Sequence, residues 1–312
     1  MKVLVAGGAG FIGSNLIECL LRDGYDVACV DNFFIGTRDN VKAFIPNAHF
    51  TLYEQDLSDL EAMKALFEKE KFDFVYHMAA NSDIQASAKN PAIEYQNTYT
   101  TTFNILECMR LYDVKNLFFC STSAVYGDAK GVPLSENYAP LMPISYYGAC
   151  KLGSEALISA FSYMNDFHTL VFRFPNVIGP HLTHGVIFDF VKRLKENPKK
   201  LRILGDGKQS KPYLYVTDLV ELIAARTEEA LPKGVTLYNV GVESQTSVTR
   251  IAEIVCDTMG LADVTFEYTG GRGGWKGDVP VFAYDLSKIH ATGWTAKLTS
   301  DEAVAETVKM VI

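Results

Sequence analysis

The stretch KVLVAGGAGFIGSNL, residues 2–16, contains the pattern that decides the fold. A short apolar run at 2–6 predicts a strand, which passes directly into regularly spaced glycines and then into a helical pattern. Glycines in that place let backbone N–H groups and a helix N-terminus approach a pyrophosphate. The residues predicted to contact a dinucleotide here are Gly7, Gly10, Phe11, Ile12 and Gly13.

An acidic residue, Asp31, ends the second predicted strand, DVACVD at 26–31. It follows the glycines by about twenty residues, the spacing typical of dinucleotide-binding folds. A carboxylate there accepts hydrogen bonds from the adenosine ribose hydroxyls and repels a 2′-phosphate, so NAD is favoured over NADP. Asn32 offers a second polar contact. The alternative is that the glycines only allow tight strand–helix packing and that Asp31 is an ordinary strand-end residue.

Beyond this start, short strand patterns alternate with longer amphipathic stretches. Further strands are predicted at 49–54, 72–79, 116–121 and 168–174, and helices lie between them, as at 59–70 and 101–112. Alternation of this kind is typical of a parallel sheet covered by helices. The sequence therefore predicts an α/β fold, a Rossmann-type doubly wound parallel sheet with a smaller C-terminal substrate-binding portion.

The regular alternation ends near Pro175. We expect residues 1–175 to form the NAD-binding domain and residues 176–312 to be mainly substrate-binding. Turn-rich segments interrupt the second part, but the patterns at 216–230 and 247–260 predict helices. Segments around 212–240 are expected to pack back on the first domain.

Composition excludes several classes of protein. The net charge of −8 over 312 residues argues against non-specific binding to nucleic acid. No apolar run approaches the ~20 residues of a membrane helix, and the N-terminus does not resemble a signal peptide, so we expect a cytoplasmic protein with no membrane partner. The six cysteines are scattered without a CxxC pair, which indicates reduced core residues. His181 and His184 lack a further ligand cluster, so no metal is predicted.

A second stretch, YYGACKLGSE at 146–155, places Tyr147 and Lys151 four residues apart on a predicted helix. Such positions are neighbours on one helical face. A fixed ammonium beside a phenol favours the phenolate, which lowers a tyrosine pKa that is ordinarily about 10. Alone, the pair is better explained by chance spacing on a helix than by catalysis.

Eight motifs together carry a family resemblance. In order they are GGAGFIGSNL, DLSD, HMAA, STSAVYG, YGACK, RFPNVIGP, GDGKQSKPYLYVTD and GWKGDVP. Their order and spacing resemble those of the extended short-chain dehydrogenase/reductases, and most closely the UDP-glucose 4-epimerase-like, NAD-dependent sugar-nucleotide epimerases. The resemblance covers nearly the whole chain.

The resemblance implies roles for the active-site residues. Tyr147 would move the proton of a sugar hydroxyl, and Lys151 would hold the nicotinamide ribose and lower the tyrosine pKa. Thr122 aligns with the active-site hydroxyl of the family, and its serine neighbours are also interpretable as a polar strand end. The related 4,6-dehydratases carry Asp-Glu after that threonine, where this chain has Ser123 and Ala124. Alanine cannot transfer a proton, so dehydration is disfavoured.

Further contacts are implied position by position. The cofactor set gains Asp56 at the adenine amino group, Leu57 on the ring, and the small residues Ala79 and Ala80. The substrate set is Thr122, Ser123, Asn176, Gly185, Val186, Lys211, Tyr213 and Arg272. For the basic residues a solvated surface role is the alternative, and for Tyr213 it is a place in the core.

The sequence thus predicts an epimerase that oxidises a nucleotide sugar transiently with a tightly held NAD and returns the hydride, acting on a UDP-hexose at C4. We also expect a homodimer. The alternatives are 2-epimerisation, ketoreduction or decarboxylation of a nucleotide sugar, and a non-catalytic NAD-sensing protein.

Overall fold

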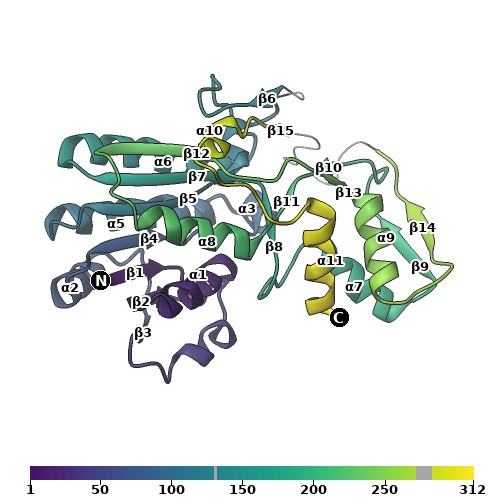
Figure 1. The fold of residues 1–312 in the computed structure, drawn as a ribbon, viewed down its shortest axis with the longest axis horizontal. Coiled ribbons are helices and arrows are strands. Elements are labelled where there is room, and N and C mark those ends of the chain that lie inside the picture. The colour runs from purple at the N-terminus through teal and green to yellow at the C-terminus, as the bar shows by residue number, and fades with distance from the viewer. Residues whose placement is uncertain (130–131, 272–282) are drawn as a thin grey trace. The chain divides into compact units, whose positions relative to one another are not determined.

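The computed structural model describes residues 1–129, 132–271 and 283–312 (Figure 1). The chain divides into two compact units. Unit 1 comprises residues 1–127, 140–173 and 220–238, and unit 2 comprises 128–139, 174–219 and 239–312.

Unit 1 is built on a seven-stranded sheet with the order β12-β7-β5-β4-β1-β2-β3. The strands are β1 Lys2–Ala6, β2 Asp26–Asp31, β3 Phe50–Glu54, β4 Phe74–His77, β5 Asn116–Thr122, β7 His168–Phe174 and β12 Gly234–Asn239. β1 pairs in parallel with both β2 and β4, and β2–β3 and β4–β5 are parallel as well. The chain winds outward from β1 in one direction and then in the other, which confirms the predicted doubly wound, Rossmann-type fold.

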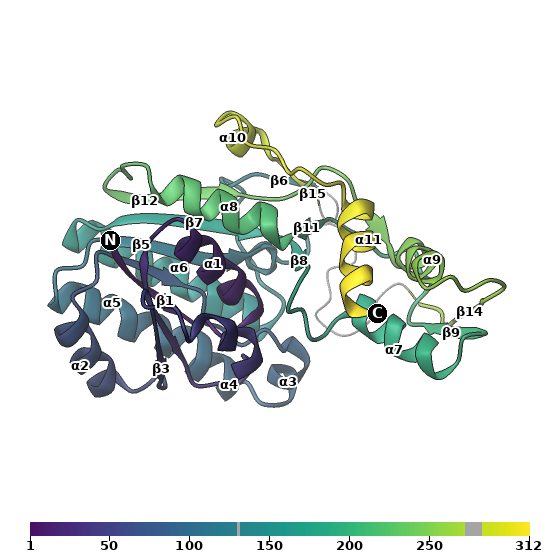
Figure 2. The ribbon, with the colours of Figure 1, turned by 60° about the horizontal axis from the view of Figure 1, so that its bottom comes forward.

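Helices cover both faces of this sheet (Figure 2). The long ones are α1 Phe11–Arg22, α2 Leu60–Glu70, α5 Thr101–Leu111, α6 Tyr146–Asn165 and α8 Val216–Thr227. Apolar side chains of α2, α5 and α6, such as Phe67, Leu106 and Ile158, form one core with Leu4 and Phe119 of the strands. The strands are nearly continuous runs of buried residues because both faces are covered.

Local sequence fixes where these helices begin. The Asp59 side chain caps α2 by accepting a hydrogen bond from the Ala62 N–H, and the Ser145 side chain caps α6 by accepting one from the Gly148 N–H. Between β4 and α5 lie the short helices α3 Ile84–Lys89 and α4 Ala92–Glu94 and a π-helix, η3 Tyr95–Thr100. The 3-10 helices are η1 Arg38–Asn40, η2 Lys42–Phe44 and η4 Ser123–Tyr126.

Within the residues that the structure describes, unit 2 combines two-stranded sheets with helices. The strand pairs are β8 Asn176–Ile178 with β11 Tyr213–Tyr215, β9 Lys200–Ile203 with β14 Thr265–Tyr268, β10 Ser210–Lys211 with β13 Thr246–Ser247, and β6 Pro133–Leu134 with β15 Ala283–Tyr284. The helices are α7 Val186–Glu196, α9 Val248–Thr258, α10 Ser287–His290 and α11 Ser300–Val311. Phe190, Leu201, Ile251 and Val304 lie in a core of its own.

Across the described residues, no helix combines the length and the apolar character that crossing a membrane would require.

Candidate active site

Gly7 and Gly13, in and after the loop between β1 and α1, are required by the backbone conformation and close packing there. Gly7 has a φ of +79°, and a Cβ there would lie 2.6 Å from the Ala79 Cα. A Cβ at Gly13 would collide with the Gly7 carbonyl oxygen. The loop that follows β1 therefore packs closely on the residues that follow β4, and only glycine allows this approach.

Gly10 is different. It is the N-cap of α1 with a φ of −72°, and no side chain caps this helix end by a hydrogen bond. A Cβ at Gly10 would meet a single neighbour, the Gly7 carbonyl oxygen, at 3.2 Å. The packing of the chain thus leaves room in front of the helix N-terminus, where backbone N–H groups attract an anion. This space fits the pyrophosphate of a dinucleotide.

Asp31 is held at the same edge of the sheet. Its carboxylate oxygens accept hydrogen bonds from the Ala9 N–H (2.9 Å) and the Phe33 N–H (2.8 Å). Burial raises the pKa of Asp31 against the effect of these two hydrogen bonds. Each oxygen keeps a second lone pair, so the fixed carboxylate can still accept ribose hydroxyls.

Asn32 and Asp56 lie side by side after β2 and β3. The Asn32 side-chain amide donates to Asp56 (3.2 Å), and the Ser58 N–H donates to the same carboxylate (2.8 Å). Although burial opposes it, hydrogen bonds from Ser58 and Asn32 hold the pKa of Asp56 below its ordinary value. Leu57 is buried in the core of unit 1, so its contact with an adenine ring stays a prediction. Ala80 is half-buried beyond the end of β4.

The three predicted catalytic residues come together at the carboxyl end of β5. Thr122 is the last residue of β5, and its hydroxyl forms a hydrogen bond with the Tyr147 phenol on α6. The Thr122 oxygen also accepts a hydrogen bond from the Ala124 N–H (3.2 Å). One turn along α6, the Lys151 ammonium donates to the Cys120 carbonyl oxygen on the same strand (2.6 Å).

The expectation that Lys151 lowers the tyrosine pKa is wrong for this structure. Burial, followed by the charge of Glu94, raises the pKa of Tyr147, and only the Thr122 hydrogen bond lowers it. The ammonium is turned toward the Cys120 carbonyl and lies 4.5 Å from the centre of the Phe119 ring. Burial in turn lowers the pKa of Lys151 to about 8. Burial and the charge of Glu94 therefore favour the phenol form of Tyr147 over the phenolate.

The serines beside Thr122 differ in their surroundings. Ser121 donates to the Glu155 carboxylate, which also accepts two hydrogen bonds from Arg173 (3.0 and 2.6 Å). This gives Ser121 a structural partner inside unit 1. Ser123 begins η4 and is half-buried.

Sequence reasoning missed Glu94. Its side chain is fully buried, and it accepts hydrogen bonds from the Asn81 amide (2.8 Å) and the Thr98 hydroxyl (2.9 Å). In the sequence it is one glutamate in a helical pattern, with no neighbour that distinguishes it from an exposed residue. Only the tertiary structure places it near Tyr147.

Apart from Thr122 and Ser123, which belong to unit 1, the predicted substrate residues that the structure describes lie in unit 2. Asn176 of β8 is exposed and is the register partner of Tyr213 in β11, while Lys211 belongs to the preceding strand β10. Tyr213 is buried in the core of unit 2, as the alternative interpretation held. Gly185, with a φ of +107°, is the N-cap of α7, and Val186 is its first residue. Arg272 lies outside the described residues.

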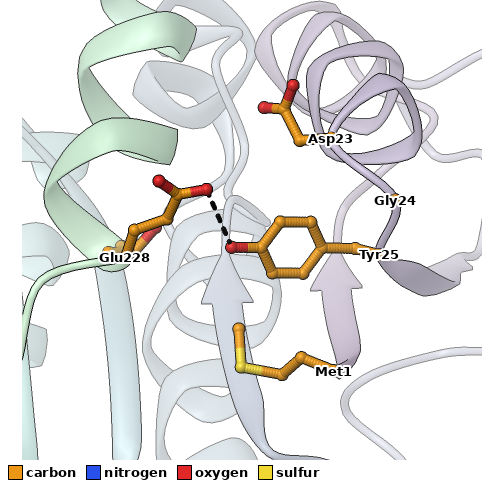
Figure 3. Close-up of a pocket in the computed structure, with 6 residues that line it drawn as sticks. Met1, Asp23, Gly24, Tyr25 and Glu228 are labelled. Atoms are coloured by element: carbon orange, nitrogen blue, oxygen red, sulfur yellow. Dashed lines mark hydrogen bonds between the residues drawn. The ribbon is translucent and has the colours of Figure 1, made fainter.

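A surface cavity of about 300 Å³ lies in unit 1 (Figure 3). It is lined by Met1, Asp23, Gly24, Tyr25, Thr227 and Glu228. The Tyr25 hydroxyl donates to Glu228 across it (3.4 Å). Met1 precedes β1 whereas Gly7 follows it, so the cavity lies at the amino end of this strand, where no predicted site residue lies. The described residues contain no group of three side chains able to hold a metal ion.

A protein-family model matches most of this chain. The family is described as the NAD dependent epimerase/dehydratase family, and the match spans residues 3–241. A curated relative, a putative UDP-glucose 4-epimerase from Methanocaldococcus jannaschii, is 32% identical over 314 residues. That alignment covers 98% of this chain and 97% of the relative.

Solved structures are similar along the whole chain. A crystal structure of UDP-galactose 4-epimerase has 36% sequence identity and a TM-score of 0.86, with 100% of this chain and 98% of the other covered. A UDP-glucose 4-epimerase from Thermus thermophilus, in complex with NAD, has 30% identity and a TM-score of 0.87, with 100% and 99% covered.

Proposed function

The chain belongs to the NAD dependent epimerase/dehydratase family, and from this premise we propose that it interconverts the C4 epimers of a UDP-sugar, a UDP-hexose above all. It is an NAD-dependent epimerase. The relatives similar over the full chain include a UDP-glucose and a UDP-galactose 4-epimerase, and this similarity supports the substrate class.

One observation supports the chemistry most. The Thr122 hydroxyl and the Tyr147 phenol are hydrogen-bonded to each other at the carboxyl end of a parallel sheet, with the Lys151 ammonium one helical turn away. The residues after Thr122 are Ser123 and Ala124, which supply no second acid–base pair. The arrangement suits proton transfer at one sugar hydroxyl and does not suit elimination of water.

In the proposed reaction Tyr147 exchanges a proton with the sugar O4. As the phenolate it takes the hydroxyl proton when the C4–H bond is oxidised, and as the phenol it returns the proton when the 4-keto sugar is reduced on its other face. Thr122 holds the phenol oxygen in position and bridges it to the sugar oxygen. When bound, NAD accepts the hydride from C4 and gives it back.

We propose that unit 1 holds the dinucleotide. The N-terminus of α1 beside Gly10 would meet the pyrophosphate, Asp31 the adenosine ribose, and Lys151 the nicotinamide ribose. The Asn32–Asp56 pair would face the adenine amino group. Because the hydride must be retained between the two half-reactions, the protein should purify with NAD bound.

We propose that unit 2 holds the nucleotide sugar. Its elements offer an exposed amide at Asn176 and a helix N-terminus at Gly185–Val186, which attracts a diphosphate. Lys211 would add a positive charge, although lysine lacks the bidentate fork of arginine.

The test is incubation of the purified protein with a panel of nucleotide sugars, without added cofactor, followed by NMR of the products. We expect conversion of a UDP-sugar to its C4 epimer and release of NAD when the protein is denatured. A C2 epimer, release of CO₂, or consumption of stoichiometric NADH would instead identify the corresponding alternative reaction. A protein that binds NAD and converts no sugar would be a sensor.

We further propose a homodimer formed through α5 and α6. The helices from α4 to α6 carry large side chains that remain exposed in unit 1, namely Tyr95, Phe103, Tyr163 and Met164. Phe103 of α5 contacts Phe161 of α6 edge-on, which joins the two helices into one apolar face. An apolar surface of this kind is typical of a protein–protein interface.

Light scattering checks this proposal. The wild type should have the mass of two chains, and Phe103→Lys should shift it toward one. The matched control Ile45→Lys changes an apolar side chain that is exposed on η2's C-terminal side and should leave the mass unchanged. A wild-type mass of one chain would contradict the proposal.

We also propose a cytoplasmic location, because the six cysteines are all free in the structure and free thiols persist in reducing compartments. Cell fractionation with an antibody checks it.

A further inference from the structure

Glu94 is a buried carboxyl group held by donors. The Asn81 amide donates to one of its oxygens (2.8 Å) and the Thr98 hydroxyl to the other (2.9 Å). The Thr98 oxygen itself accepts from the Asn81 N–H (3.2 Å), so its own hydrogen is directed at Glu94. Burial raises the pKa of Glu94, and these hydrogen bonds and the charge of Lys151 oppose that rise by favouring the carboxylate, which only accepts hydrogen bonds.

No cation is paired with this carboxylate among the described residues. The other carboxylate that acts on Lys151 is Glu155, and it is engaged by the Arg173 guanidinium in a two-bonded pair. The charge of Glu155 is thereby neutralised locally, whereas that of Glu94 is not. The buried positive charge that Glu94 acts on is Lys151.

The elements around the pair place this charge beside α6. Glu94 ends α4 and adjoins the π-helix η3, and both elements pack against α6. The other titratable groups facing Tyr147 and Lys151 are Cys120 of β5, His77 of β4, and Glu155 of α6 itself. The thiol pKa of Cys120 is raised to about 12 and the imidazole pKa of His77 is lowered, both chiefly by burial, so these two groups stay neutral.

We propose that Glu94 is the buried counter-charge of the Tyr147–Lys151 pair and a positioning residue for proton transfer. The same carboxylate binds Asn81, which follows the small residues Ala79 and Ala80, and so ties the loop after β4 to the helix opposite α6. The proposal rests on the proposed function in one respect only, that this pair performs the proton transfer.

The charge of Glu94 acts in the same direction on both members of the pair. It raises the pKa of Tyr147, which favours the phenol, and it raises the pKa of Lys151, which favours the ammonium. Glu94→Gln keeps the shape of the side chain and removes the charge. Both groups should then lose their protons at lower pH.

The direct test is an NMR titration of Lys151 in the purified protein, with ¹³C at the lysine Cε and with Lys151→Met to assign the signal. The wild type should titrate near a pKa of about 8, and Glu94→Gln should titrate at lower pH. The matched control is Glu107→Gln on α5, whose partner is Arg110. This control should leave the Lys151 titration unchanged. Equal midpoints in the wild type and Glu94→Gln would overturn the proposal.

A reciprocal measurement serves if Glu94→Gln does not fold. Coupling between two sites is mutual, so removing the ammonium in Lys151→Met must raise the pKa of Glu94. The ¹³C signal of the Glu94 carboxyl reports that value directly. An unchanged Glu94 titration in Lys151→Met would reject the counter-charge.

The pH dependence of kcat/KM gives the functional readout. In Glu94→Gln both limbs of the profile should move to lower pH, because a tyrosine pKa lowered by one gives about tenfold more phenolate on the acid side. A residue that only holds the fold would lower the rate at every pH and leave the limbs in place. If no sugar is converted, the proposed function fails, but the NMR titrations still decide the role of Glu94.

Discussion

At the residue scale, the chemistry depends on one oxygen of Tyr147. We expect Tyr147→Phe to lose about 10²–10⁴-fold in kcat, the usual contribution of a general acid–base. The ring is retained and still packs, so NAD content should be unchanged. Steady-state kinetics together with assay of the nucleotide released on denaturation checks both points. Turnover equal to wild type would remove Tyr147 from the mechanism.

Asp31 should decide between the two nicotinamide cofactors. Asp31→Ala removes an acceptor for the ribose hydroxyls and also the repulsion of a 2′-phosphate. Loss of a charged hydrogen-bond partner costs about 1.5–3 kcal/mol, so NAD should bind roughly ten- to a hundred-fold more weakly. Calorimetry on cofactor-stripped wild type and Asp31→Ala, each with NAD and with NADP, gives the four dissociation constants. A mutant that keeps the full NAD preference would show that Asp31 is not the ribose ligand.

Lys151 should make stability depend on pH. Its pKa is lowered by burial from 10.5 to about 8, so between these values the unfolded chain binds more protons than the folded one. The buried Lys151 therefore lowers the free energy of unfolding by its full amount below pH 8. This loss of stability disappears as the pH rises to 10.5. Between pH 8 and 10.5, the free energy of unfolding of the wild type should rise by up to about 3 kcal/mol relative to that of Lys151→Met.

Denaturant unfolding of both proteins as a function of pH measures the difference. The lost hydrogen bond to the Cys120 carbonyl adds a term that does not vary with pH, so only the slope matters. A difference that stays constant across the window would mean that the ammonium is not held at a cost in the folded state.

At the scale of elements, the loop from β1 to α1 separates glycines that serve the fold from one that serves a ligand. Gly7→Ala places a Cβ against the Ala79 backbone at positive φ and should destabilise the protein by about 1–3 kcal/mol. Gly10→Ala meets only the Gly7 carbonyl at 3.2 Å, so thermal unfolding of the NAD-free protein should change little.

Gly10→Ala should weaken NAD binding although it changes the stability little. A methyl group in the space for the pyrophosphate costs about 1–3 kcal/mol, roughly five- to 150-fold in affinity. Calorimetry on stripped protein measures this loss, with melting of the same sample as the control. A Gly10→Ala protein that binds NAD normally would place the pyrophosphate elsewhere.

Elements with a strong local pattern could be predicted from the sequence. The strands at 2–6, 26–31 and 168–174 have the predicted bounds, and the helix at 59–70 differs only because Asp59 is its cap. Periodicity and end signals are local, so one sequence contains them. β12, Gly234–Asn239, was missed because it joins the sheet far from the alternating region.

The site shows the same limit. Tyr147, Lys151 and Thr122 belong to motifs that stand out along the chain, and the structure brings them together. Glu94 belongs to no motif, and its burial arises from the packing of α4 and η3 on α6. The predicted direction of the tyrosine pKa shift was wrong because burial, followed by the charge of Glu94, raises this pKa, whereas the sequence shows only the nearby lysine.

At the scale of the whole molecule, the two units divide the two ligands in our proposal. Unit 1 supplies the dinucleotide loop and the proton-transfer residues, while unit 2 has its own core and supplies Asn176, Lys211 and α7. Neither unit alone contains all the predicted contacts.

The most direct measurement follows the hydride transferred at C4. The UDP-hexose identified by the panel is prepared with deuterium at C4 and incubated with the protein in ordinary water, with no added cofactor. Transient oxidation predicts a C4 epimer that keeps the deuterium at C4, because the hydride never leaves the active site. Loss of the deuterium to solvent, or epimerisation at another carbon while C4 is untouched, would contradict C4 epimerisation by transient oxidation.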